Sequence, residues 1–222
     1  MTDEQIERLA ARVIERLTPP VLVMVTAAEG YRTEIRQRLA GCGYPLRIAA
    51  EAGLADAAAW QEAGELLPPR AWQDTLPPAP WRAVLVPFLD YPLAASLLDG
   101  TLNSPVARRL HDALLAGIPV LALRYHCDPH SELNQLRGAR ADSAYAGHLQ
   151  NMLARLEAAG VELCTMNALL ARLADPATAG VASHEPRGYL TVTDLVNNPA
   201  LATAPHARLT DAAMDFLKNR KL

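Results

Sequence analysis

The densest group of chemically reactive side chains in this sequence is the run Arg124-Tyr125-His126-Cys127-Asp128-Pro129-His130. Its central residues, His126, Cys127 and Asp128, are consecutive, so their side chains cannot all converge as a catalytic triad. Two histidines four residues apart in a loop do not by themselves define a metal site. We interpret the run as a loop after a buried strand that covers a ligand crevice, where Arg124 or His126 contacts the ligand.

The remaining reactive residues are widely spaced along the chain. Cys42, Cys127 and Cys164 show neither a CxxC pair nor metal-ligand spacing, so we expect no disulfide framework and no metal site. Small buried hydrophobes are the simplest interpretation of these cysteines. Asp90 next to Tyr91 has two interpretations, an acid and base pair or a solvated hydrogen bond.

The composition narrows the class of protein. Half of the 222 residues are apolar, a fifth are charged and the net charge is -3. These values describe a globular chain without the basic surface that nucleic acid requires. No apolar stretch reaches the roughly 20 residues that a membrane helix needs, and the N-terminus lacks the order of a secretory signal. We therefore expect a cytoplasmic protein that binds neither nucleic acid nor membrane.

The elements that position these residues alternate between strands and helices. We expect strands at 21–25, 45–50, 83–87, 118–123 and 161–164, and helices at 31–40, 92–99, 105–115, 144–159 and 167–174. The first strand is continuously apolar, which is typical of a parallel strand covered on both faces. The proline-rich stretch 53–80 indicates a short helix and an irregular crossing. The pattern predicts a Rossmann-like (flavodoxin-like), doubly wound parallel α/β sheet with helices on both faces.

Two appendages flank this domain, which we place at 20–174. Residues 1–18 contain an amphipathic helix that either packs on its own domain or binds a groove on a partner. Residues 175–188 have the composition of a linker, and 189–222 form a C-terminal arm. The arm is too small to bury much surface alone, so we expect it to dock on the main domain or on a neighbouring subunit.

Segments 82–173 carry an ordered set of motifs. One reads VLVPFLDYPLAASLLDGTLNSPV from Val84 to Val106, and the later ones read GIPVLAL at 117–123 and LEAAGVE at 156–162. In order and wording they resemble the flavoprotein family of FMN-dependent cysteine decarboxylases, which includes phosphopantothenoylcysteine decarboxylase. The resemblance covers residues 20–173 and implies an FMN-binding domain that assembles as a homotrimer.

The resemblance implies FMN at the carboxyl ends of the strands, where loops and helix N-termini meet. The loops 26–30 and 88–92 and the turn at Asn103 occupy these positions. The predicted cofactor contacts are Thr26, Ala27, Ala28, Phe88, Asp90, Asn103, Ser104 and Arg124.

Two motifs depart from the family pattern. The usual Thr-Gly-Ser after the first strand is Thr26-Ala27-Ala28, and the usual Pro-Ala-Ser-Ala-Asn-Thr is Pro-Phe-Leu-Asp-Tyr-Pro at 87–92. The family's asparagine helps to position the substrate carboxylate, and an acidic Asp90 in its motif would repel one. We therefore do not expect this chain to decarboxylate a cysteinyl peptide.

The appendages suggest a cellular setting. The N-terminal helix with its Pro19-Pro20 break resembles encapsulation peptides of bacterial microcompartments, and 190–194 and 209–213 resemble tails encoded with them. We expect an FMN-binding or FMN-derived flavoprotein in the microcompartment lumen, tethered to a shell or cargo protein and serving redox or cofactor maintenance. The alternatives are a non-enzymatic scaffold or adaptor that has lost the flavin, and an enzyme of this fold that uses another nucleotide.

Overall fold

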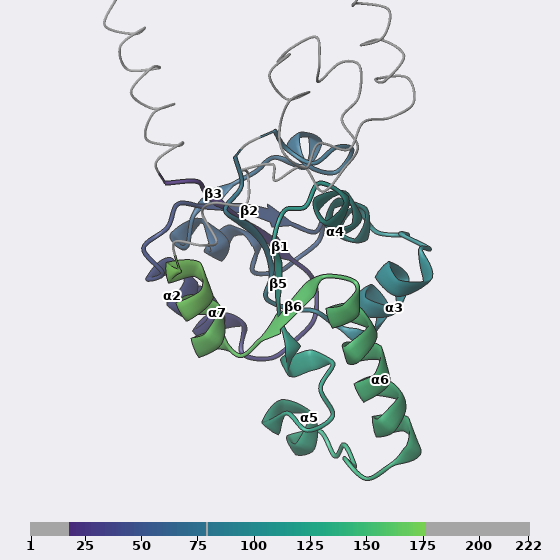
Figure 1. The fold of residues 1–222 in the computed structure, drawn as a ribbon. Helices are drawn as coiled ribbons and strands as arrows, with labels where there is room; N and C mark the ends of the chain where they lie inside the picture. Colours follow the sequence, from purple (N-terminus) through teal and green to yellow (C-terminus); the bar gives the residue numbers. More distant parts are fainter. Residues whose placement is uncertain (1–17, 79, 176–222) are drawn as a thin grey trace, which may run out of the picture. The chain divides into compact units, whose positions relative to one another are not determined.

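The computed structural model describes residues 18–175 except residue 79 (Figure 1). The strands are β1 (Val21–Val25), β2 (Leu46–Ala50), β3 (Glu65–Leu66), β4 (Ala83–Val86), β5 (Val120–Leu123) and β6 (Val161–Cys164). The α-helices are α2 (Arg32–Ala40), α3 (Tyr91–Asp99), α4 (Pro105–Leu115), α5 (Glu132–Leu136), α6 (Ala144–Ala158) and α7 (Met166–Ala174). Three 3-10 helices, η1 (Ala57–Glu62), η2 (Pro69–Ala71) and η3 (Arg124–His126), complete the described elements.

The six strands form one sheet in the order β3-β2-β1-β4-β5-β6, and every pairing is parallel. The chain first builds outward from β1 to β3, then returns to β4 on the other side of β1. This is the strand order of the Rossmann fold, whose ligands bind beyond the carboxyl ends of the strands where the order reverses. The reversal falls between β1 and β4, so the predicted fold class is confirmed.

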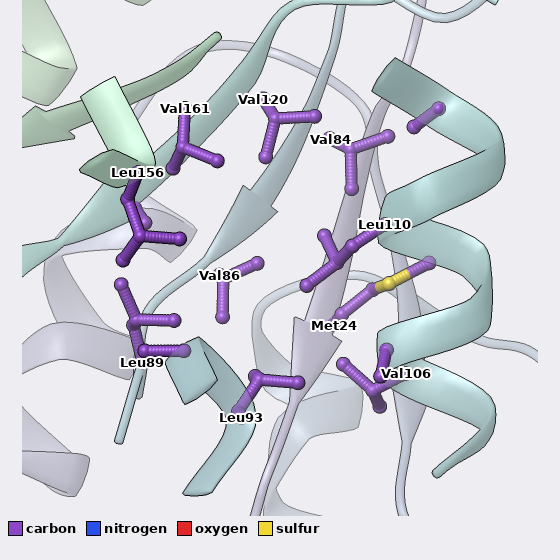
Figure 2. Packing of buried hydrophobic residues seen from close by; sticks show 14 of the residues in the cluster. Met24, Val84, Val86, Leu89, Leu93, Val106, Leu110, Val120, Leu156 and Val161 are labelled. Carbon is purple, nitrogen blue, oxygen red and sulfur yellow. The ribbon is translucent and has the colours of Figure 1, made fainter. Parts of the chain in front are cut away.

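Each face of the sheet has its own hydrophobic core. Leu22 and Met24 belong to the core that α3, α4 and α6 cover, whereas Val21, Val23 and Val25 belong to the core that α2 and α7 cover. Figure 2 shows part of the first core, with Met24 of the sheet beside helix α4. Because both faces of β1 are buried, the strand needs the uninterrupted apolar run that the sequence contains.

The observed elements agree with the predicted ones to within one or two residues, and the exceptions are short. Segment 53–80 contains two 3-10 helices and the two-residue edge strand β3, which pairs with β2 through Glu65 and Leu66. β3 and α5 are too short for their apolar residues to recur with a strand or helix period, so the sequence did not predict them. The predicted N-terminal helix, nearly all of the linker and the C-terminal arm lie outside the described residues.

Candidate functional site

The loops after β1 and β4 meet at the point where the strand order reverses. The hydroxyl of Thr26, which is almost completely buried, donates a hydrogen bond of 2.7 Å to the carbonyl of Phe88. This bond closes the two loops against each other just beyond the strand ends. The hydroxyl proton of Thr26 is therefore already used within the fold.

The loop after β5 is fastened to the same two loops. Nε2 of His126 lies 3.0 Å from the carbonyl oxygen of Glu29, and the thiol of Cys127 donates to the carbonyl of Leu89 at 3.1 Å. Arg137 also donates to the carbonyl of Glu29, at 2.7 Å. Three segments from different parts of the sequence thus form one connected surface at the carboxyl edge of the sheet.

A hollow of about 250 Å³ opens on this surface toward α3 and α4, and we call it the α3 hollow. Its lining residues are Thr26, Ala27, Glu51, Asp90, Pro92, Leu93, Ser96, Asn103 and Ser104. Five of the eight predicted contact residues lie here together, although they come from three separate segments. The sequence prediction did not include Glu51, which follows β2.

The two helices that begin at this hollow carry their own caps. The carboxylate of Asp90 accepts a hydrogen bond of 2.9 Å from the backbone N–H of Leu93 in α3. Ser104 does the same for α4, accepting from the N–H of Ala107 at 3.0 Å. These side chains occupy a backbone donor that a bound phosphate would otherwise use.

The charge of the α3 hollow is negative. Burial raises the pKa of Glu51, the nearby charge of Asp90 raises it further, and a hydrogen bond from the N–H of Ala27 opposes the shift. No lysine or arginine is among the described residues that line this hollow. Its carboxylates therefore suit hydroxyl or N–H donors and repel phosphates and carboxylates.

The other three predicted residues lie away from the α3 hollow. The ring of Phe88 is fully buried in the opposite core, in edge-to-face contact with Trp60 and His126 at 5.8 and 5.7 Å between centroids. Ala28 packs against that same core, and Arg124 lines a separate pocket beyond β5 and β6.

A second hollow of about 590 Å³ lies beside the beginning of α2, and we call it the α2 hollow. Its lining residues are Ala27, Glu29, Gly30, Tyr31, Arg32, Thr33, Arg36, Gly53, Leu54, Ala55 and Asp56. Ala27 also lines the α3 hollow, so the two hollows lie on either side of the residue that follows Thr26.

Helix α2 begins differently from the other α-helices in the described part of the chain. In five of these six helices the N-cap side chain accepts a hydrogen bond from its own helix, and the caps are Asp90, Ser104, Ser131, Ser143 and Thr165. The N-cap of α2 is Tyr31, whose side chain makes no such bond and whose backbone is left-handed with φ of 56°. Gly30 before it also has positive φ, at 114°. The first amides of α2 therefore have no acceptor from the N-cap side chain, and the first residues of the helix, Arg32 and Thr33, line the α2 hollow.

Two arginines on α2 line this hollow and differ in their partners. Arg32 is engaged by both carboxylate oxygens of Asp56 and by the carbonyls of Thr26 and Ala28. Nε of Arg36 is buried without a hydrogen-bond partner, with the nearest oxygen of Glu62 at 3.6 Å. Arg36 forms an ion pair with the exposed Glu62 at this distance and is thus the less engaged of the two guanidiniums, one turn after Arg32 on the same helix.

The reactive run 124–130 does not form a catalytic centre. His126 and Cys127 contact different backbone carbonyls, while Asp128 accepts from Gln150 and from the N–H of His130. Burial raises the pKa of the Cys127 thiol far above its ordinary value. The run instead fastens the loops after β1 and β4 to each other through His126 and Cys127, and its contact with a ligand stays a prediction.

Burial raises the pKa of Cys164 to about 11 and also raises that of Cys42. Since all three cysteines are free, and their thiols favour the protonated form, they behave as packing residues. Within the described residues no cluster of three or more His, Cys, Asp or Glu side chains could hold a metal ion. The described part of the chain also contains no helix able to span a membrane.

The fold and the two hollows define a Rossmann-like parallel α/β protein with a crevice at its reversal point. Comparison with protein-family models and with curated proteins finds no match to this chain. The parallel pairing of all six strands establishes the fold, and the flavoprotein resemblance of segments 82–173 stays a hypothesis.

Proposed function

We propose that this chain binds a phosphorylated mononucleotide, with FMN as the candidate, across the two hollows at the carboxyl edge of the sheet. The observation that carries the proposal is the start of α2, which lacks a side-chain cap and opens into a hollow lined by Arg36. Backbone amides at a helix N-terminus with a guanidinium nearby suit a phosphate.

The two hollows differ in charge, and this difference favours one orientation of such a ligand. The phosphate suits the α2 hollow, where the terminal nitrogens of Arg36 and the first amides of α2 can donate, and where Asp56 is already paired with Arg32. The remainder then crosses Ala27 into the α3 hollow, where Glu51 and Asp90 accept from hydroxyl and N–H groups. FMN has this composition, with one phosphate, a hydroxylated chain and a ring with N–H donors, so the residues present fit the group.

When bound, FMN supplies redox chemistry, and the residues of this chain restrict what it can act on. A substrate carboxylate near Glu51 and Asp90 would be repelled. This supports the expectation that the chain does not decarboxylate cysteinyl peptides, and it favours a redox or cofactor-maintenance role. In that role the two carboxylates would hold neutral or cationic donors.

One observation favours the second candidate, a scaffold or adaptor of the same fold that has lost the flavin. The ring of Phe88 fills the space below the loop after β4, with the guanidinium carbon of Arg32 at 4.5 Å from its centroid. Together with the bond from Thr26 to the Phe88 carbonyl, this packing closes part of the reversal point. A ligand is then limited to the two hollows.

Titration with FMN, riboflavin and AMP separates these functions. We expect the full-length protein to quench FMN fluorescence and to bind FMN about tenfold or more tightly than riboflavin, which lacks the phosphate. Arg36→Gln should abolish this preference, whereas Arg140→Gln, an exposed arginine paired with Asp142, should retain it. Equal binding of FMN and riboflavin would contradict the phosphate position. No flavin binding would favour the scaffold, and preference for AMP would favour another nucleotide.

The microcompartment association and the homotrimer stay predictions, because the N-terminal helix and the arm lie outside the described residues. A chain lacking residues 1–18 should fail to co-purify with microcompartments if the helix is an encapsulation peptide. Light scattering on the full-length protein measures the trimer directly. Retention of the truncated chain in microcompartments would exclude the tether.

A further inference from the structure

A third pocket, separate from both hollows, lies between α2, the segment after β5 and the start of α7. It has a volume of about 520 Å³, and its lining includes Arg124, Tyr125, Leu133 and Met166. Tyr31 borders both this pocket and the α2 hollow. The proposed nucleotide site makes no use of the rest of this pocket.

A buried carboxylate anchors the guanidinium of Arg124 at this pocket. Asp128 is only 7% exposed, and its Oδ1 accepts from Gln150 and from the N–H of His130, both at 2.9 Å. Its Oδ2 lies 2.8 Å from Nε of Arg124, an ion pair that lacks the alignment of a hydrogen bond. Because Gln150 and His130 hold the Asp128 carboxylate in place, the ion pair fixes the Nε end of the Arg124 guanidinium.

The terminal nitrogens of Arg124 remain available to a ligand. Among the described residues they have no hydrogen-bond acceptor, and the side chain is about one-third exposed at the pocket wall. A guanidinium held in place by one carboxylate offers its other N–H groups in the planar geometry that suits a second carboxylate.

The rest of the pocket is aromatic and apolar. The rings of Tyr31 and Tyr125 meet edge to face with centroids 6.0 Å apart. The hydroxyl of Tyr125 accepts from the N–H of Met166 at 2.7 Å, which leaves its own proton to donate. Ile35 and Met166 are buried at the wall. These surfaces suit a flat apolar body attached to the anionic group.

The remaining charges of the lining disfavour a doubly charged anion. Arg38 adds a second guanidinium, which donates to the side chain of Asn167 at 2.6 Å. Glu34 and Glu132, both exposed, join Asp128 in the lining. Solvent screens the two exposed glutamates, so a monoanion can bind through its local pair with Arg124, whereas a phosphate dianion meets a lining with more carboxylates than guanidiniums.

We propose that this pocket is a binding site for a small aromatic monocarboxylate, whose carboxylate pairs with Arg124 and whose ring packs against Tyr31 and Tyr125. The site is independent of the nucleotide proposal, because its anchor and its charge differ from those of the α2 hollow. It assigns Arg124 to this ligand instead of to the cofactor.

Calorimetry on the full-length protein with phenylacetate, phenylacetamide and 2-phenylethylamine tests this site. We expect phenylacetate to bind at least about tenfold more tightly than the neutral amide, because the amide cannot form the charged pair with Arg124. The amine should bind no better than the amide. If phenylacetamide or 2-phenylethylamine binds the unmodified protein as tightly as phenylacetate does, the proposal is wrong.

Two variants then locate the binding. Arg124→Gln should lower phenylacetate affinity by about tenfold or more, and the exposed control Arg140→Gln should leave it unchanged. Circular dichroism of both variants checks that they fold. Arg36→Gln should also leave phenylacetate binding intact, so failure of the nucleotide proposal does not affect this test. Unchanged affinity in folded Arg124→Gln would exclude this pocket.

Discussion

Arg32 at the start of α2 and Asp56 after β2 form a two-pronged ion pair, with both N–H···O distances at 2.7 Å. The third nitrogen of the same guanidinium donates to the carbonyls of Thr26 and Ala28, at 2.7 and 2.9 Å. One side chain therefore fixes the loop after β1 against the segment after β2. Because Ala27 lies between those two carbonyls, the pair sets the position of the residue that the α2 and α3 hollows share.

Replacement of Asp56 by Asn should destabilise the fold by about 1–2 kcal/mol, because Arg32 loses a charged partner while staying largely buried. The hydrogen bonds from Arg32 lower the pKa of Asp56 below its ordinary 3.8. The contribution of the pair is therefore present above that value and is lost as the pH falls through the lower, folded-state pKa. Urea unfolding at neutral pH measures the difference.

The control for this variant is Asp142→Asn, which removes a charge pair between two exposed side chains, Arg140 and Asp142. Its cost should stay within about 0.5 kcal/mol, because solvent screens exposed pairs. Equal costs for the two variants would show that the Arg32 pair has no special structural role.

The fold could be predicted from the sequence because its strands are covered on both faces. Val21–Val25 and the strands at β4 and β5 are buried without a break, so each leaves a continuous apolar run that is bounded by turn residues. The caps Asp90 and Ser104 lie directly before their helices and leave equally local signals. The edge strand β3 leaves no such signal, since two residues carry no period.

The site could be predicted only in part. That Thr26, Asp90 and Ser104 lie together could be predicted, because loops after strands of a parallel sheet share one edge. Glu51 and Arg36 line the two hollows but were not predicted, because their burial depends on segments distant in the sequence. Phe88 shares the loop of Asp90, but alternation along the chain directs its ring into the opposite core, which a motif comparison does not reveal.

His126 should make the fold less stable in mildly acidic solution. Burial lowers its pKa below the ordinary 6.5, and the charges of Arg137 and Arg32 act in the same direction. The bond to the Glu29 carbonyl and the charge of Asp90 act in the opposite direction but do not cancel the shift. The unfolded chain therefore binds a proton first as the pH falls, and stability decreases from roughly pH 7 to pH 5.

His126→Gln should flatten this dependence, because glutamine does not titrate and retains an N–H donor for the Glu29 carbonyl. Urea unfolding of both proteins across the pH range gives the two slopes. If His126→Gln loses stability with falling pH as steeply as the original protein, other titrating groups cause the effect.

Glu51 should have the opposite pH dependence. Its pKa is raised above the ordinary 4.5, so the folded state keeps the proton to a higher pH than the unfolded chain does. The free energy of unfolding should therefore fall as the pH rises from the unfolded-state pKa of Glu51 through its higher folded-state pKa. Glu51→Gln removes the buried charge and keeps an acceptor for the N–H of Ala27, so it should be more stable than the original at pH 7. The gain in stability of Glu51→Gln should disappear near pH 4. If the variant were less stable than the original protein at pH 7, the predicted direction of the pH dependence would be wrong.

Gly64 should be essential to the edge of the sheet, and Gly147 should not. A Cβ atom at Gly64 would collide with the backbone oxygen of Leu46 and would lie 2.9 Å from its carbonyl carbon, so β2 and the start of β3 would have to separate. Gly64→Ala should therefore cost about 2 kcal/mol or more, in the range of other forced backbone shifts. Gly147 lies within α6, and a Cβ atom added to it would have no described neighbour within 4 Å, so Gly147→Ala should stabilise the protein by about 0.5–1 kcal/mol. Thermal unfolding of the two single variants compares the same chemical change at both sites, and equal shifts in Tm would refute the close approach of Gly64 to β2.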